Sequence, residues 1–414
     1  MERRVAITGL GAITPVGNTA AESWESLKAG KSGIGPITKF DASNQRVKVA
    51  AEVKDFDARE VFGVAEARRN DPFVHYAIVA ANEAVADAGL DGEDVIDRER
   101  LGVYVGSGVG GIESTVVNED ALVKSGPNRV SPFSIPAMIS NMAAGQIAIR
   151  HKCYGPTLPV VTACATSTHA IGEAFRAIKH GYADAIIAGG SEAPIVPVAV
   201  AGFANAKALT RNPDPATACR PFDANRDGFV MGEGAAILVL EEMEHALARG
   251  AHIYAEICGY GNTCDAYHIT SPDPNAAGIA RAISQAVAEA DCDPSKGLYI
   301  NAHGTSTKLN DASETAGIKL ALGEEAAHEV KISSTKSMTG HMLGAAGAIE
   351  ALASVKVLEE KIVPPTINLV DADPDCDLDY TPGSAVEFDA KWALSDSLGF
   401  GGHNAALVFK AFEG

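Results

Sequence analysis

One cysteine and two histidines in this sequence stand where their side chains could act on a substrate. Cys164 lies in VVTACATSTHA (160–170), where β-branched residues give way to the small residues typical of a helix start. His303 follows an apolar run in NAHGTST, and His341 lies in STKSMTGHMLGAAG, shortly after Lys336. A helix N-terminus favours the thiolate over the thiol, and the thiolate is the nucleophile. The pattern therefore predicts covalent catalysis at Cys164.

A thiolate with two imidazoles fits acyl transfer, in which cysteine holds an acyl group and histidines donate hydrogen bonds to a developing oxyanion. A cysteine protease fits less well, because it needs one histidine with an Asn or Asp and leaves Lys336 and the second histidine without a role. A cysteine that only packs stays open as an alternative, because free cysteines are among the most buried residues.

Glycine-rich segments elsewhere give weaker signals. Phe400 lies among glycines in SLGFGG, where it could swing as a gate or sit in a tight turn before the last strand. GLGAITPVG has Thr14 where a dinucleotide-binding loop needs glycine, and GSGVGG (106–111) lacks the lysine of a P-loop. Neither nucleotide-binding pattern is therefore expected.

Composition narrows the class of protein. The chain has 414 residues, 46% of them hydrophobic and 21% charged, which is typical of a globular protein. No apolar run could span a bilayer and the start resembles no signal peptide, so a cytoplasmic protein is expected. The net charge of −19 argues against nucleic acid as the main partner. Seven cysteines without a C-x-x-C pair predict neither a disulfide framework nor a metal site.

Short β-branched runs alternate with helical patterns, which predicts an α/β protein. Helices are expected over about 73–88 and 278–290. Strands are expected at RVAITGLG (4–11), LGVYVGSG (101–108), PVVTAC (159–164), ADAIIAGG (183–190), AAILVLEE (235–242), LYINAHG (298–304), KISSTK (331–336) and AALVFKAF (405–412).

Internal similarity predicts a duplicated βα unit. AVADA (84–88) returns as AVAEA (286–290), and GLG (9–11) resembles GYG (259–261). CATSTHAIGEA (164–174) matches HMLGAAGAIEA (341–351), which aligns Cys164 with His341 at an offset of 177. We expect two halves, 1–252 carrying the cysteine and 253–414 carrying the two histidines, with Cys164 and His341 facing each other from equivalent helix starts.

These motifs together resemble the β-ketoacyl-acyl carrier protein synthases of the thiolase superfamily, and among them synthase II. The resemblance extends from about residue 3 to residue 411 and includes DAYHIT (265–270) and RPFDANRDGFVMGEGA (220–235). It implies a thiolase-like five-layered αβαβα fold and a homodimer that elongates fatty acids by decarboxylative Claisen condensation. The substrates would be acyl and malonyl groups on the phosphopantetheine of acyl carrier protein, without a cofactor.

The resemblance also implies roles for single residues. Cys164 would hold the acyl chain, His303 and His341 would stabilise the malonyl enolate, and the backbone N–H groups of Cys164 and Phe400 would bind the acyl-enzyme oxyanion. Phe400 would also gate the site. Supporting residues would be Lys336, Glu350, Asp311, Thr305, Thr307, Asp265, His268 and Thr270.

Other positions follow the family pattern less closely. Val109 and Phe229 would line the acyl pocket, and the acidic carrier protein would dock on a local basic patch. The matching docking residues are Arg68, Arg69, Arg129, Lys207 and Arg211. The chain departs from synthase II at Asp396, Leu398 and His403, where Asn, Phe and Thr are common.

Three neighbouring classes remain to be weighed. The ketosynthase subunit of a type II polyketide synthase shares the same Cys and His residues and stays as the alternative function. A non-catalytic chain-length partner lacks the nucleophile, which Cys164 supplies here. A thiolase acting on coenzyme A thioesters needs a second cysteine in the C-terminal glycine-rich loop, where this chain has Phe400 and no cysteine after Cys376.

Overall fold

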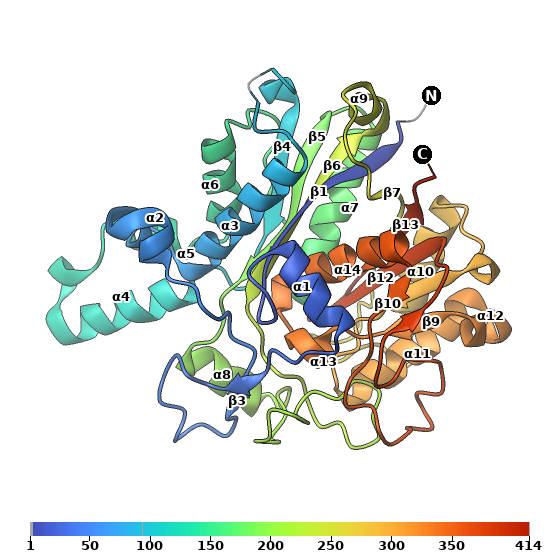
Figure 1. Cartoon of the computed structure of the whole chain (residues 1–414). Helices are drawn as coiled ribbons and strands as arrows, with labels where there is room; N and C mark the ends of the chain where they lie inside the picture. The colour runs from blue at the N-terminus through green and yellow to red at the C-terminus, as the bar shows by residue number, and fades with distance from the viewer. Residues whose placement is uncertain (1–2, 93, 414) are drawn as a thin grey trace.

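One mixed β-sheet runs through the molecule in the computed structural model, which describes residues 3–92 and 94–413 (Figure 1). Its strands follow the spatial order β4 (Leu101–Gly106), β5 (Ala185–Glu192), β6 (Gly234–Glu242), β1 (Val5–Ile13), β7 (Ala255–Cys264), β13 (His403–Ala411), β12 (Trp392–Gly399), β8 (Leu298–Asn301) and β9 (Lys331–Ser333). β1 and β7 pair antiparallel only through residues 5–7 and 255–257. This short junction joins an N-terminal half of the sheet to a C-terminal half.

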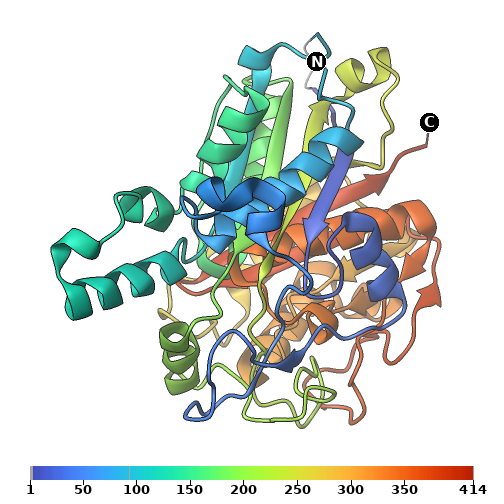
Figure 2. The same ribbon diagram turned by 60° about the vertical axis from the view of Figure 1, so that its left-hand side comes forward.

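Helices divide the fold into the predicted five layers (Figure 2). α7 (Thr166–Lys179) and α14 (Ala346–Glu360) pack against each other and against strands of both halves of the sheet, so they form the middle layer. α3 (Pro72–Asp87) and α6 (Met142–His151) cover the outer face of the N-terminal half. α10 (Ala277–Glu289) and α11 (Lys308–Leu322) lie together beyond the C-terminal half, with α10 on β7 and β13.

The composition of α14 explains its central place. Within residues 346–358 every side chain except that of Lys356 is buried. A helix that is apolar on all sides is stable only when other elements surround it. The small residues at the start of α14 also allow close approach to α7, since a Cβ at Gly347 would lie 1.8 Å from Thr168 Oγ1.

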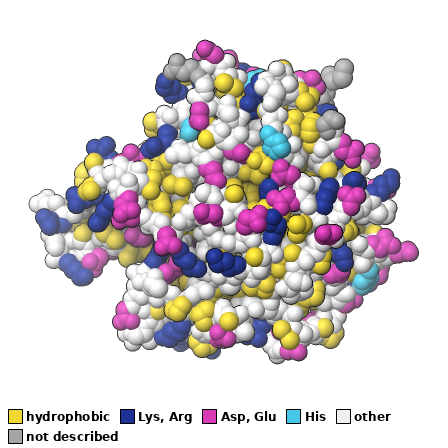
Figure 3. Space-filling view, viewed as in Figure 1, with side chains coloured by type: hydrophobic (Ala, Val, Ile, Leu, Met, Phe, Trp, Pro, Cys, Tyr) yellow, Lys and Arg dark blue, Asp and Glu magenta, His cyan; other side chains and the backbone are white. Residues whose placement is uncertain are grey.

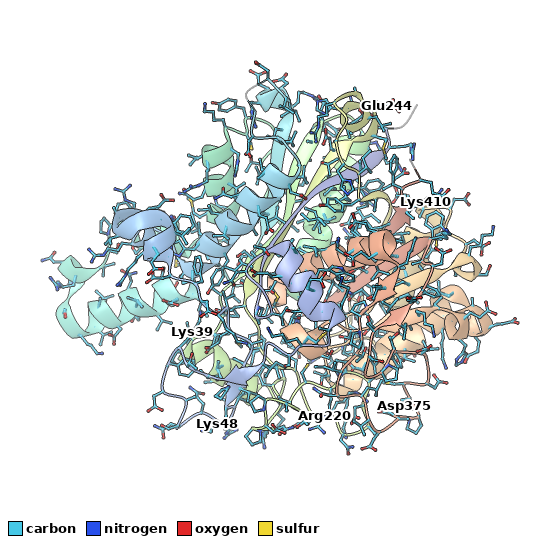
Figure 4. The ribbon with its side chains drawn as sticks, in the orientation of Figure 1. Lys39, Lys48, Arg220, Glu244, Asp375 and Lys410 are labelled. Carbon is cyan, nitrogen blue, oxygen red and sulfur yellow. The ribbon has the colours of Figure 1, made fainter. Side chains whose placement is uncertain are left out.

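The remaining elements flank these layers. α4 (Ile112–Ser125) and α5 (Ser134–Met138) project from the body as an arm beside α2 (Ala58–Ala67), as both ribbon views show. The loop carrying Lys39 and Lys48 runs beside α8 (Pro197–Asn205) and β3 (Val49–Ala50) (Figure 1 and Figure 4). The other elements outside the layers are α1 (Ala20–Lys28), α9 (Met243–Ala248), α12 (Glu324–Glu329), α13 (Lys336–Thr339), β2 (Gly35–Pro36), β10 (Ile362–Val363) and β11 (Val386–Glu387).

Two of the predicted repeats coincide with equivalent contacts in the two halves. A Cβ at Gly9 would lie 2.2 Å from the carbonyl oxygen of Ala84, and a Cβ at Gly259 would lie 2.1 Å from that of Ala286. The N–H of Leu10 donates to the Asp87 carboxylate at 2.9 Å, as the N–H of Tyr260 donates to Glu289 at 3.0 Å. β1 with α3 and β7 with α10 are therefore the same unit built twice. The division between residues 252 and 253 stays a prediction.

The third repeat was predicted in the wrong register. A 3₁₀ turn at Ala163–Ala165 precedes α7, and a 3₁₀ turn at Leu343–Ala345 precedes α14, so the offset is 180 residues rather than 177. Ala163 and Leu343, the first residues of the two turns, both have positive φ, 52° and 45°. The structure thus aligns Cys164 with Gly344, and His341 lies three residues earlier. Helix starts that are rich in small residues match each other in several registers, so the sequence alone could not determine the offset.

Most strand predictions are confirmed, but PVVTAC is wrong as a strand. The segment before Cys164 touches the sheet at a single bridge between Thr157 and Val103, then turns into the 3₁₀ helix. β7 and β12 were missed, because glycine, serine and asparagine weaken their β-branched pattern. Among the described residues no helix is long and apolar enough to cross a membrane.

Candidate active site

Cys164, His303 and His341 line one cavity of about 460 Å³. Cys164 comes from the turn before α7, His303 from the loop after β8, and His341 from the loop after α13. Aromatic side chains close one wall, where the Phe229 ring meets His341 edge to face with 5.1 Å between ring centroids. Phe203 was missed by the sequence predictions and bridges Phe229 and Phe400, at 5.6 and 6.3 Å.

Cys164, the predicted nucleophile, is buried, and its thiol is protonated at rest. Cys164 is 9% exposed, and burial raises the pKa of its thiol to about 12, although Lys336 and the backbone N–H of Phe400, which hydrogen-bonds the thiol, act in the opposite direction. The prediction that the helix start would favour the thiolate is therefore wrong for this site. Desolvation outweighs the helix start, so attack has to be accompanied by loss of the thiol proton.

The two imidazoles lie perpendicular to each other, with 5.2 Å between ring centroids and 87° between ring planes. Burial lowers the pKa of both His303 and His341 well below the ordinary value, and the positive charge of Lys336 adds to this effect. Both rings are therefore neutral near pH 7. A neutral imidazole carries one N–H donor and one acceptor nitrogen.

Lys336 fixes the tautomer of His303. Its Nζ lies 3.3 Å from Nδ1 of His303 and forms a buried ion pair with Glu350. An ammonium group can only donate, so Nδ1 of His303 is the acceptor and its N–H is on Nε2. Burial raises the pKa of Glu350 to about 7, and Lys336 opposes the shift. Lys336 and Glu350 thus contact the histidine from behind the cavity, and their catalytic role stays a prediction.

Two further carboxyl groups hold the backbone of His303. Glu314 of α11 accepts the N–H of His303 at 2.6 Å and that of Gly304 at 2.8 Å. Asp396 of β12 accepts the same His303 N–H at 3.2 Å. Glu314 was not predicted, because an acidic residue within a helix gives no signal until the fold places it behind a loop.

The other predicted supporting residues separate into two groups. Thr305, Thr307, Asp265 and Thr270 line the cavity, and the hydroxyls of Thr305 and Thr307 are 3.0 Å apart. His268 does not line it, and its Nδ1 accepts N–H groups within its own exposed loop.

Asp311 lies behind the cavity instead of in its lining. It accepts the N–H of Phe222 at 2.9 Å and pairs with the buried Arg226, whose Nε is 3.3 Å away. Arg226 also donates to the carbonyl oxygens of Thr307 and Lys308. Asp311 and Arg226 therefore support the loop that brings Thr305 and Thr307 to the cavity.

Of the predicted pocket residues, Phe229 lines the cavity and Val109 does not. Val109 is 39% exposed at the start of the projecting arm, and Glu192 accepts its N–H at 3.1 Å. Glu192 also accepts the N–H of Gly344 at 2.8 Å, so one buried carboxylate links the loop of Val109 to the C-terminal half. Glu192 was missed because it reads as the end of an ordinary strand.

The predicted docking residues do not form one patch. Lys207 lies at the cavity together with Lys308, which the sequence predictions omitted. Arg68 and Arg129 line a separate cavity of about 410 Å³ beside α2 and α4. The Arg69 guanidinium lies 5.4 Å from the Phe133 ring centroid, and the backbone N–H of Arg211 donates to Asp227. Figure 3 shows Lys and Arg side chains interspersed with Asp and Glu, several of them on the arm of α4.

Comparison with known proteins identifies the family. Residues 2–246 match the N-terminal domain of β-ketoacyl synthases, and residues 254–370 match the C-terminal domain. The chain belongs to the β-ketoacyl synthase family. This synthase is 52% identical to the 3-oxoacyl-[acyl-carrier-protein] synthase 2 of Synechocystis sp. over 100% of this chain and 99% of that one. It is also 52% identical to synthase 2 of Staphylococcus aureus, over 99% of each.

Solved structures of ketosynthases share the fold of this β-ketoacyl synthase. The ishigamide ketosynthase/chain length factor matches with a TM-score of 0.92 and 37% identity over 100% of both chains. A type II polyketide acyl-carrier protein in complex with its ketosynthase, bound to the hexaketide, matches with a TM-score of 0.90 and 35% identity, again over 100% of both chains.

Proposed function

We propose that this β-ketoacyl synthase is a 3-oxoacyl-[acyl-carrier-protein] synthase II, an acyltransferase that elongates fatty acids by two carbons. The full-length identity of 52% to the two synthases 2 supports this assignment. The observation that carries the chemistry is the cavity in which one thiol meets two neutral imidazoles.

In the first half-reaction, Cys164 accepts an acyl chain from the phosphopantetheine of acyl carrier protein. The sulfur of Cys164 forms the new thioester as it loses its proton, the carrier thioester breaks, and the carrier thiol takes up a proton. The N–H groups of Cys164 and Phe400 bind the oxyanion of the intermediate, a position supported by the hydrogen bond between the Phe400 N–H and the thiol. Phe400 gates access with the loop of Asp265 and Thr270.

In the second half-reaction, malonyl-acyl carrier protein loses carbon dioxide, and the electron pair of the broken C–C bond passes into the thioester as an enolate. His303 and His341 donate hydrogen bonds to the enolate oxygen, which is worth about 3 kcal/mol for each such donor. The carbanion then attacks the Cys164 thioester, a C–C bond forms, and the sulfur leaves and recovers a proton. Neutral imidazoles suit this step because each supplies one N–H.

Replacement of Cys164 tests the proposal. Purified Cys164→Ala should condense a long acyl-acyl carrier protein with malonyl-acyl carrier protein at least about 1,000-fold more slowly than the wild type, because the acyl group has no attachment point. Cys292→Ala removes another buried thiol, outside the cavity, and serves as the matched control. Unchanged condensation by Cys164→Ala would end the proposal.

A homodimer is part of the proposal. Along the arm of α4 and α5 and in the segment before Cys164, the chain exposes apolar side chains that a second copy would cover: Val109 (39% exposed), Phe133 (41%), Ile135 (60%), Met138 (37%), Leu158 (46%) and Val161 (50%). Exposed apolar surface of this kind marks protein contacts. The second copy would complete the acyl pocket at Val109, and light scattering at micromolar concentration measures the dimer.

Carrier docking and location complete the proposal. Lys207 and Arg211, with Arg68, Arg69 and Arg129, would attract the acidic carrier protein, although Lys207 and the pair Arg68 and Arg129 line separate cavities. The enzyme would work in the cytoplasm without cofactor, metal, nucleic acid or membrane. Charge reversal at Lys207 should raise KM for the carrier-bound substrate more than it lowers kcat.

The ketosynthase subunit of a type II polyketide synthase is the second candidate. The fold similarity to the ketosynthase of a type II polyketide system, at 35% identity, favours it, whereas the higher identity to synthases 2 favours fatty acid service. An acyl-chain-length scan separates the two: synthase II elongates long acyl chains alone, while a polyketide subunit needs a partner subunit for activity.

A further inference from the structure

Asp396 and Glu314 converge on a single backbone donor. Glu314 accepts the His303 N–H at 2.6 Å, and Asp396 accepts the same N–H at 3.2 Å. Oδ2 of Asp396 is buried and meets no hydrogen-bond donor among the described residues. Two ionised carboxylates that meet at one N–H repel each other, so this approach requires a proton on one of them.

The strand places Asp396 among apolar residues. Ser395 and Ser397 point to the opposite face, where Ser397 meets Thr168 of α7 at 2.7 Å. On the face of Asp396, the side chains of Leu394 and Ala406 belong to the same apolar cluster as Ile318 of α11. Both Asp396 and Glu314 are 0% exposed. A second negative charge there would be costly without a cation.

No cation is left over for this pair. The charged and titratable groups around it are His303, Lys336 of α13, Glu350 of α14, Tyr380 and, next to Glu314 on α11, Asp311. Lys336 pairs with Glu350, and Arg226 pairs with Asp311. Among residues 3–92 and 94–413, no Lys, Arg or His forms an ion pair with Glu314 or Asp396.

We infer that Glu314 and Asp396 share one proton and act as a positioning pair that holds the His303 loop while the pair is singly ionised. The role assigned to His303 rests on the proposed function. Burial raises the pKa of both carboxyls, as a shared proton requires. Asp396 stands where synthase II commonly has Asn. An Asn amide would donate a hydrogen bond to Glu314 at every pH, whereas Asp396 and Glu314 depend on the proton that they share.

Removal of the shared proton would disturb the site directly. Two adjacent carboxylates would repel each other, and both are bonded to the N–H of His303. The perpendicular arrangement of His303 and His341 depends on that anchor, so the step that needs both imidazoles slows. Acyl transfer to Cys164, which uses the N–H groups of Cys164 and Phe400, is affected less.

Infrared spectroscopy of the full-length protein tests the shared proton without any substrate. The band of a protonated carboxylic acid should lose one component in Asp396→Asn and the same component in Glu314→Gln, because either amide supplies the proton that the pair otherwise shares. Asp120→Asn, an exposed carboxyl on α4, is the control that leaves the band unchanged. A wild-type band that neither variant changes would overturn the inference, as would loss of the component in only one of them.

The pH profile of malonyl-acyl carrier protein decarboxylation tests the positioning role. The wild-type rate should fall about 10-fold as pH rises and the infrared component disappears, whereas Asp396→Asn should change by less than about 2-fold over the same range. An equal fall in both proteins would overturn the role. A wild type that decarboxylates at no pH would instead contradict the proposed function, and the infrared result would still stand.

Discussion

The starts of α7 and α14 have the same backbone conformation but carry different side chains at equivalent positions. Each begins with a residue of positive φ, passes through a 3₁₀ turn and enters a buried helix. The N-terminal copy places a thiol, Cys164, at the second position of the turn, and the C-terminal copy places Gly344 there. His341, the imidazole of the second copy, stands three residues earlier. Duplication therefore supplied two equivalent turns, and each position in them was free to serve a different step.

The largest expected effect is a loss of condensation without a matching loss of acyl transfer to Cys164. His341→Ala or His303→Ala should slow condensation about 100- to 1,000-fold, because each removes one donor to the enolate. Acyl transfer to Cys164 should change much less, since its oxyanion is bound by backbone N–H groups. Single-turnover acylation and steady-state condensation measure the two steps. Slower acylation with intact condensation would reverse the roles assigned to the two starts.

The turn before α14 has no room for a side chain at Gly344, although the equivalent position before α7 carries Cys164. A Cβ at Gly344 would lie 2.5 Å from the backbone N of Gly108 and 2.6 Å from Glu192 Oε2. Gly344→Ala should therefore lower the free energy of unfolding by about 1–3 kcal/mol. Denaturant unfolding measures the change, with Gly202→Ala as the control, because a Cβ there meets nothing within 4 Å. Equal stability of the two variants would contradict the tight packing at this turn.

The buried imidazoles of His303 and His341 should make the folded protein less stable in acid. Burial depresses the pKa of His303 and His341, so the unfolded chain binds protons that the folded chain excludes. Each histidine thus contributes stability that is present above about pH 6.5 and is lost, at about 1.4 kcal/mol per pH unit, as pH falls below it. His341→Asn should remove one such contribution, which is measured as a shallower slope of unfolding free energy from pH 6 to pH 5. Parallel slopes would mean that His341 is charged in the folded protein.

The smallest expected effect comes from the hydroxyl of Thr166 in α7, which has no counterpart at the start of α14. Thr166 accepts the N–H of Thr162 at 2.9 Å, whereas the equivalent position in α14 is Ala346. Thr166→Ala should cost about 1 kcal/mol of stability and shift the turn that carries Cys164. The measurement is unfolding free energy together with the acylation rate. Thr166→Ser keeps the hydroxyl and should restore both.

The sequence predicted the members of the site better than its geometry. Cys164, His303 and His341 were found because each stands at the end of a recognisable segment, and Lys336 followed from its motif. The register between the halves failed, because alanine and glycine in both helix starts match at several offsets. Glu314, Glu192 and Phe203 were missed because their partners are distant in sequence. The protonated state of Cys164 also depends on how completely the cavity closes, which no local pattern contains.

The burial of the Cys164 thiol has a consequence for the chemical durability of the enzyme. Oxidants and small alkylating agents react with thiolates, and exposure sets which cysteine they reach first. Cys264 is exposed beside Gly401, whereas Cys164 is buried and protonated. Mild peroxide should therefore modify Cys264 while condensation persists. A nucleophile that is inert between turnovers survives conditions that would inactivate a permanently ionised one.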